Sequence, residues 1–174
     1  MNDEKSLSSQ GLEVDATWNA TETLVLTSAG TFRDPVYDSF TGSSTGDISA
    51  TASSGIPETA TSTSATHILD VKNLAASLRA DWQYESPVDY FDAVGTGFTG
   101  TDNNTLLGYE KEISTIKASA GFTTENRLGV TFRGRNIFDD QYITTPFPGA
   151  AQARTLSGYP SAPPTYGVTI RKSF

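Results

Sequence analysis

The sequence predicts an all-β fold, an antiparallel up-and-down transmembrane β-barrel, to which this chain contributes about seven strands. Three observations support the prediction. Segments with an apolar residue at every second position recur along the chain, and the connections between them are alternately short and long. No window combines helix caps with the i, i+3, i+4, i+7 apolar spacing of an amphipathic helix. Alternating strands joined by short turns on one side and long loops on the other are typical of outer-membrane barrels.

Four segments alternate most regularly: 12–19, 74–85, 127–135 and 165–173. Each carries apolar or small residues at its even-numbered positions and mostly polar or charged residues at its odd-numbered ones. One face of each strand is therefore apolar. Lys172 is the one charge on the apolar face of these segments, and it stands close to the chain end, where a long side chain reaches water.

Three weaker segments complete the seven strands: 22–33, 58–70 and 111–124. The first is small and apolar, and the third alternates except at Ile113. The second consists almost entirely of Ser, Thr and Ala, so the sequence does not assign its two faces.

The connections divide the predicted strands into hairpins. Residues 19–21, 71–73 and 125–126 read as tight turns, and residues 37–57, 87–110 and 139–163 as long loops rich in Gly, Ser, Thr, Asp and Pro. In a barrel the turns are periplasmic and the loops extracellular. A soluble β-sandwich also has alternating strands, but the many small residues on the apolar face and the charges opposite them favour a barrel with a wet lumen.

An odd strand number places the two ends of the chain on opposite sides of a membrane, whereas single-chain bacterial barrels have even numbers. We therefore expect the last part of a longer barrel, with Met1 an internal or artificial start. The opening MNDEKSLSSQG is acidic and polar and is not a signal peptide.

Composition excludes several kinds of site. The 174 residues include no cysteine and one histidine, so neither a cysteine site nor a histidine cluster can form. A net charge of −8 argues against a nucleic-acid partner. No nucleophile–base set and no phosphate loop appears, and we expect neither an enzyme nor a cofactor.

Several segments resemble one protein family. RGRNIFDDQY, residues 133–142, resembles the Asn-Leu-Phe-Asp-x-x-Tyr segment near the end of TonB-dependent outer-membrane receptors, and YGVTIRKSF resembles their final strand. SLRADWQYES is similar to another barrel strand of the family. SQGLEVDATWNATETLVLTSAGTFRD resembles a family hairpin, although Ala20 stands where the family has proline and Phe32 is the aromatic residue before the aspartate. The matching hairpin positions are Gly11, Glu13, Trp18, Thr21, Leu24 and Leu26.

The resemblance implies that residues 1–174 are the C-terminal portion of a receptor barrel, without its plug domain and earlier strands. It implies energised uptake of a scarce nutrient across the outer membrane of a Gram-negative bacterium. The ligand would be a ferric siderophore, or else cobalamin or a glycan. Partners would be outer-membrane lipid, TonB through the missing N-terminal region, and the barrel-assembly machinery. The alternatives are a passive pore or surface-binding barrel that closes as an oligomer, and a soluble β-sandwich binding module.

The candidate residues fall into four groups. Asn136, Phe138, Asp139 and Tyr142 form the family motif, in which Asp139 and Asp140 begin a solvated loop. Membrane-interface aromatics are Trp18, Trp82, Tyr84, Phe138 and Tyr142. The assembly signal is Tyr166, Val168, Ile170 and Phe174. Arg79, Arg133 and Arg135 are candidate lumen-facing contacts of an anionic ligand or the plug, and pairing of Arg133 and Arg135 with carboxylates of neighbouring strands is the alternative to a ligand.

Overall fold

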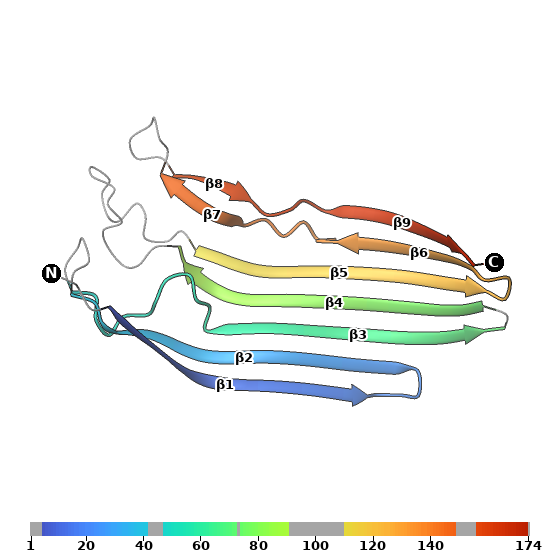
Figure 1. Cartoon of the computed structure of the whole chain (residues 1–174), viewed down its shortest axis with the longest axis horizontal. Helices are drawn as coiled ribbons and strands as arrows, with labels where there is room; N and C mark the ends of the chain where they lie inside the picture. Colours follow the sequence, from blue (N-terminus) through green and yellow to red (C-terminus); the bar gives the residue numbers. More distant parts are fainter. Residues whose placement is uncertain (1–4, 42–46, 73, 91–109, 149–155, 174) are drawn as a thin grey trace.

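A computed structural model describes residues 5–41, 47–72, 74–90, 110–148 and 156–173 of the chain. Nine strands and no helix occur in these residues. Seven strands form one antiparallel sheet in the order β1-β2-β3-β4-β5-β6-β9, and the other two form a separate hairpin (Figure 1). The sheet strands are β1 (Ser6–Asn19), β2 (Leu24–Ser39), β3 (Thr59–Val71), β4 (Leu74–Asp89), β5 (Glu110–Thr124), β6 (Leu128–Arg135) and β9 (Thr165–Lys172).

The seven predicted strands are thus the seven strands of the main sheet, each paired with its neighbours in chain order. The predicted long loops are shorter than expected at two places. β2 continues to Ser39 and β4 to Asp89, in each case beyond the residue at which the apolar alternation ends. Residues 91–109 of the second predicted loop lie outside the described residues.

The third predicted loop, 139–163, contains a hairpin that the sequence analysis missed. β7 (Ile143–Pro148) pairs antiparallel with β8 (Leu156–Pro160). Pro146 and Gly158 read as loop signals, but proline is tolerated in a two-stranded ribbon, where each strand has a free edge. Phe147 and Tyr159 stack across the pair with ring centroids 5.4 Å apart.

Strand register settles which residues share a face. Trp18 pairs with Leu26, and the same row continues through Ala65, Ala80, Ala118 and Gly134 to Tyr166 on β9. We call the side of the sheet that carries this row the apolar face and the other side the polar face. The odd-numbered residues of β3, from Thr59 to Leu69, belong to the apolar face, which the sequence had left unassigned.

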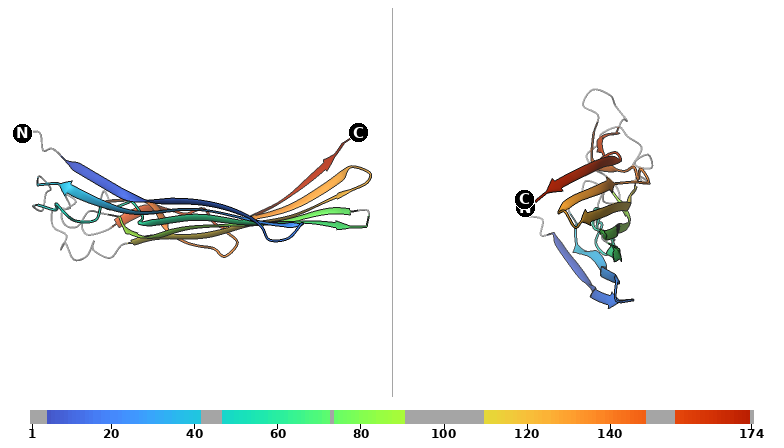
Figure 2. Two further views of the ribbon diagram at one scale, coloured as in Figure 1. Left: turned by 90° about the horizontal axis from the view of Figure 1, so that it is seen from below. Right: turned by 90° about the vertical axis from the view of Figure 1, so that its right-hand side faces the viewer.

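The sheet is a single curved and twisted layer (Figure 2). Among the described residues no second layer covers its apolar face, where only Ile137 packs close to Gly134 in the row. The buried apolar side chains include Pro35, Phe40, Ile48 and Val88, which lie near the long connections. Trp18 and Tyr166 on the apolar face are 64% and 73% exposed. A sandwich needs a second sheet over the first, and the described residues provide no second layer of comparable size.

The short turns lie at the end of the sheet where β9 ends, and β1 begins at the opposite end (Figure 1). In the first turn the Thr21 hydroxyl accepts hydrogen bonds from the backbone N–H groups of Thr23 and Leu24, at 3.2 and 3.0 Å. Lys72 and Arg127 adopt positive φ angles of 55° and 58° in the other two. The sheet strands are thus joined by short connections at the three predicted places, after Asn19, Val71 and Thr124, although residue 73 of the second predicted turn lies outside the described residues.

Candidate functional site

The segment 136–142, which we call the Asn136 turn, links the end of β6 to β7. Asn136 is buried and adopts a φ of 49°. Its side-chain amide donates to the carbonyl oxygens of Asp140 (3.0 Å) and Ala162 (2.9 Å). Its side-chain oxygen accepts from the backbone N–H of Asp140 at 2.8 Å. One side chain thus joins the chain leaving β6 to the chain entering β9.

The Asn136 turn is also tied to β5. Ile137 donates its backbone N–H to the Ile116 carbonyl at 3.1 Å, and the Asp140 carboxylate accepts the Ser114 N–H at 2.7 Å. Asp140 is half-buried. Asp140, expected at the start of a solvated loop, thus also receives a backbone hydrogen bond, because β5 runs past the end of β6 and presents the Ser114 N–H to it. Asp139 is exposed as expected, with a φ of 57°.

The ends of the strands on the long-connection side are held together locally. Residues 48–53 return along β2. The backbone N–H of Ser53 donates to the Pro35 carbonyl at 2.9 Å, and the backbone N–H of Tyr37 donates to the Thr51 carbonyl at 3.0 Å. The Tyr90 hydroxyl donates to the Ile143 carbonyl and so joins the end of β4 to β7. Burial raises the pKa of Tyr90 and also that of Tyr142.

The predicted interface aromatics occupy different environments. Trp18, Trp82 and Tyr84 all lie on the apolar face by register, and the Trp82 indole N–H donates to the Ser114 hydroxyl at 3.1 Å. Phe138 is 72% exposed, whereas Tyr142 is half-buried in the Asn136 turn. Trp82 and Tyr84 also stack, with ring centroids 5.7 Å apart.

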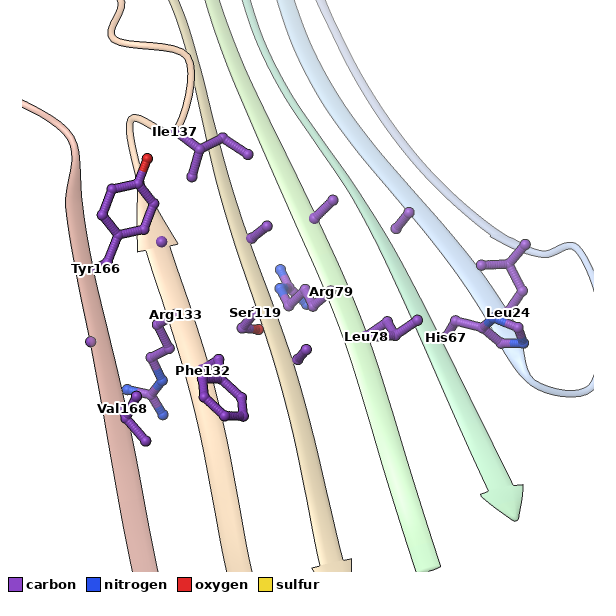
Figure 3. A pocket seen from close by; sticks show the side chains of 16 residues that line it. Leu24, His67, Leu78, Arg79, Ser119, Phe132, Arg133, Ile137, Tyr166 and Val168 are labelled. Carbon is purple, nitrogen blue, oxygen red and sulfur yellow. The ribbon is translucent and has the colours of Figure 1, made fainter.

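A shallow groove of about 850 Å³ crosses the apolar face from Leu24 at the start of β2 over β3, β4, β5 and β6 to β9. Its floor consists of small residues in neighbouring strands, and larger side chains such as Leu78, Phe132 and Tyr166 stand around it (Figure 3). The small floor residues are Ala65, Ala80, Ala118, Ala120 and Gly134.

The predicted lumen residues Arg79, Arg133 and Arg135 share the polar face, together with Lys117, which the sequence analysis did not single out. We call these four the cationic cluster. Arg79 forms an ion pair with Asp81 at 2.5 Å and donates to the Thr66 hydroxyl at 3.2 Å. Lys117 donates to the Gln83 side-chain oxygen at 2.8 Å. The register of β5 with β4 and with β6 brings the four close together, and sequence alone does not give that register.

The predicted assembly residues Tyr166, Val168 and Ile170 lie in β9 on the apolar face, and Phe174 lies outside the described residues. The alternation had placed the three correctly, because β9 pairs with β6 without a register shift.

Neither a metal centre nor a helical membrane span is present in the part of the chain that the structure describes. No three acidic or histidine side chains there converge in a way that could hold a metal ion. No helix there has the length and apolarity to cross a bilayer.

No protein-family model matches the chain, and no curated protein matches it by sequence. The fold is similar to that of the ferric yersiniabactin uptake receptor FyuA from Yersinia pestis, with a TM-score of 0.72 and 14% sequence identity. The match covers 98% of this chain and 24% of that receptor, so the chain spans about a quarter of the receptor's length. At this identity the likeness establishes the fold alone, an all-antiparallel sheet.

Proposed function

We propose that this chain forms part of the wall of a TonB-dependent outer-membrane receptor that takes up a scarce nutrient, most specifically a ferric siderophore. The observation that carries the proposal is a seven-stranded, single-layer sheet whose apolar face is not covered by a second layer in the part of the chain that the structure describes. A soluble protein rarely exposes a contiguous apolar surface of this extent. The fold likeness to a ferric siderophore uptake receptor supports the choice of barrel.

The dimensions of the apolar face fit a bilayer. On β4 its residues run from Leu74 to Tyr84. At about 3.3 Å per residue and a tilt of about 40°, this stretch spans roughly 25 Å along the membrane normal, the height of the apolar band of an outer-membrane barrel. The large side chains on it, including Leu78 and Trp82, would contact lipid.

The two outer strands of the sheet, β1 and β9, are paired on one side only in the described residues. Unpaired strand edges are not tolerated in hydrocarbon, so further strands must close the sheet. We assign residues 1–174 to the last part of a barrel of about 22 strands, because the Asn136 turn and YGVTIRKSF resemble the end of such receptors. The plug and the segment that contacts TonB would then belong to other parts of the receptor.

Tryptophan quenching by brominated lipid tests the membrane assignment. In single-tryptophan variants reconstituted into vesicles, we expect both Trp18 and Trp82 to be quenched. A matched control moves the probe by one residue to the polar face, by Gln83→Trp in a background without Trp18 and Trp82, and its emission should be unaffected. Equal quenching of tryptophan emission at residues 82 and 83 would contradict the membrane assignment.

Uptake measurements test the transport assignment. In the bacterium that makes the protein, inactivation of its gene should abolish uptake of iron supplied as one class of ferric siderophore, and loss of TonB should have the same effect. Uptake that persists without TonB would indicate a passive pore. If uptake of ferric siderophores is unchanged and uptake of cobalamin or a glycan is lost, the protein would still be a TonB-dependent receptor, but its ligand would be the cobalamin or glycan.

Recognition by the barrel-assembly machinery is part of the proposal. Tyr166, Val168 and Ile170 form a row on the apolar face that ends near Phe174. Deletion of Phe174 from the protein made in cells should lower the amount of folded barrel in the outer membrane. Deletion of the exposed residue Asn126 from a turn controls for shortening the chain, and an equal loss in both would contradict a terminal signal.

A further inference from the structure

β3 differs from its neighbours on the apolar face. Along the stretch from Leu74 to Tyr84, the neighbouring strand β4 carries large apolar or aromatic side chains at most of its apolar-face positions. The apolar-face positions of β3 opposite this stretch hold a single large aliphatic residue between two chain turns of small and polar ones: Thr61, Thr63, Ala65, His67 and Leu69. Ser28 of β2 pairs with Thr63 and extends the polar surface. We call Ser28, Thr61, Thr63 and His67 the polar stripe.

The polar stripe is not fully hydrogen-bonded within the sheet. The hydroxyl oxygens of Ser28 and Thr63 lie 3.0 Å apart and share one hydrogen bond, so one of the two hydroxyl hydrogens remains to be donated. His67 Nε2 lies 3.1 Å from the Thr23 hydroxyl, and the described residues supply no partner for Nδ1. Hydrocarbon offers no hydrogen-bond partner. Lipid tails are therefore a poor cover for this part of the apolar face.

The surface beside the polar stripe is hollow. Ala65, Ala80, Ala118 and Gly134 form one row across four neighbouring strands and make up the floor of the groove, with larger side chains such as Leu78 standing beside it (Figure 3). Transmembrane helices associate through small residues, which let two backbones approach closely, and through hydroxyl and imidazole groups that bond across the contact. The same physical reasons apply to a sheet. The stripe and the hollow together therefore have the composition of a contact between membrane proteins.

We propose that the polar stripe and the hollow beside it form the contact surface for a second copy of this protein, packed side by side in the membrane. The proposal rests on the proposed function, which places the apolar face in the membrane plane. Two copies inserted in the same direction are related by a two-fold axis along the membrane normal, so each residue meets residues of the partner at its own depth.

The side chains of the polar stripe suit such a symmetric contact. Hydroxyls and the neutral imidazole each offer a donor and an acceptor, so they can bond to groups of their own kind. A charged group at the same depth would instead oppose its own copy. Asp, Glu, Lys and Arg are absent from the apolar face of β2, β3 and β4 over the described rows from Thr61 to Leu69.

The size of the surface also fits a second copy. With strands about 4.8 Å apart and a rise of about 3.3 Å per residue, a contact centred on β3 and reaching from β1 to β5 measures about 19 Å by 33 Å. Roughly 600 Å² of sheet on each copy gives about 1,200 Å² in total, the lower end of specific interfaces. Leu78 and Trp82, which contact lipid in a single copy, border the stripe and pack on the partner's hollow in the dimer. A single acyl chain fills the floor row but leaves the hydroxyls unpaired.

Cysteine cross-linking in the membrane tests the contact directly. The 174 residues contain no cysteine, and the unsubstituted protein gives the background. Thr63→Cys and Ala65→Cys, introduced into the protein as the bacterium makes it, are oxidised in isolated outer membranes with copper phenanthroline. We expect a disulfide-linked dimer in amounts at least several-fold above those from Leu12→Cys. Leu12 is 61% exposed on the same face of β1, but it lies in the row of Thr59, outside the contact.

Dimer dissociation in mild detergent tests the hydrogen-bonding groups. Thr63→Leu with His67→Leu replaces them by side chains suited to lipid, so the barrel should still fold. The dissociation constant of the dimer, measured by analytical ultracentrifugation, should rise by about tenfold or more. Thr63→Ser with His67→Gln keeps a donor and an acceptor at each position and should retain the dimer.

Three results would overturn the proposal: a monomeric wild-type protein in mild detergent, equal cross-linking at positions 12, 63 and 65, or a cross-linked product that contains a different protein. The last would assign the surface to another partner. Brominated-lipid quenching in vesicles at low protein density separates this inference from the proposed function. Normal quenching of Trp18 and Trp82 without a dimer contradicts the contact alone, whereas loss of that quenching contradicts the membrane assignment itself.

Discussion

Asn136 adopts a left-handed backbone conformation at the end of β6, with a φ of 49°, while its carboxamide bonds to backbone groups on both sides of the β7–β8 hairpin. Asn is among the few residues other than glycine that enter this conformation readily. Its amide offers both donors and an acceptor, as a backbone peptide group does. These two properties together account for an asparagine at the head of the family-like motif.

Asn136→Asp isolates the donor function of this side chain. The carboxylate can still accept the Asp140 N–H, but it cannot donate to the carbonyl oxygens of Asp140 and Ala162. Leaving buried groups unsatisfied costs about 1–3 kcal/mol each. We expect a lower urea midpoint for the folded protein in detergent, while Asn126→Asp in an exposed turn should change stability by less than about 0.5 kcal/mol. Equal midpoints for the two variants would contradict the role of Asn136.

Because of Tyr90, the stability of the sheet at its long-connection end should depend on pH in the alkaline range. Burial raises its pKa, so the neutral phenol that donates to Ile143 is favoured in the folded state. The resulting stability is fully present below the ordinary tyrosine pKa of about 10 and is lost as pH rises through the raised value. The difference in tyrosinate absorbance between the wild type and Tyr90→Phe should titrate above pH 10. A difference titration at or below that value would show that Tyr90 is not buried.

At the scale of single elements, the strands were predictable because a period of two is a local property of the sequence. Leu74, Leu78 and Trp82 reveal the apolar face of β4 without any neighbour. The faces of β3 were not predictable, because Thr61 and Ser62 suit either side, and pairing with β2 and β4 decides between them. The β7–β8 hairpin was missed because its prolines are local loop signals, and the tie from Ser114 to Asp140 joins residues far apart in sequence.

Two glycines at neighbouring positions give opposite predictions for the β6–β9 pair. A Cβ added to Gly134 would lie 2.6 Å from Ile137 Cγ2 and 3.3 Å from the Tyr166 ring, whereas one added to Gly167 meets nothing within 4 Å. We expect Gly134→Ala to destabilise the protein by about 1–3 kcal/mol through overpacking. Gly167→Ala should be neutral or stabilising by up to about 1 kcal/mol, because alanine has less backbone freedom to lose. Urea unfolding in detergent measures the stability of both variants. Equal destabilisation would show that the nearby Ile137 and Tyr166 side chains do not exclude a Cβ at position 134.

At the scale of the whole molecule, the sheet is organised by its two faces. Cross-strand pairs and the Asn136 turn hold the strands in register, but no second layer of described residues covers the apolar face. Under the proposed function, apolar surroundings would supply the free energy that a soluble domain gains by burying a core. Both free edges, at β1 and β9, require pairing as well. Such a sheet is consistent with a wall element that depends on lipid on one side and on neighbouring strands at its edges.

Adjacent substitutions on β4 distinguish a lipid-facing surface from an exposed aqueous one. Leu78, on the apolar face, and Ser77, on the polar face, are both exposed in the sheet and lie near the middle of the apolar band. If the apolar face contacts hydrocarbon, Leu78→Arg should destabilise the assembled barrel by about 2–4 kcal/mol, the range for arginine at the bilayer midplane. Ser77→Arg places the same charge in a wet lumen and should have little effect. Urea unfolding in lipid vesicles measures the difference, and equal stability of the two variants would mean that water covers both faces.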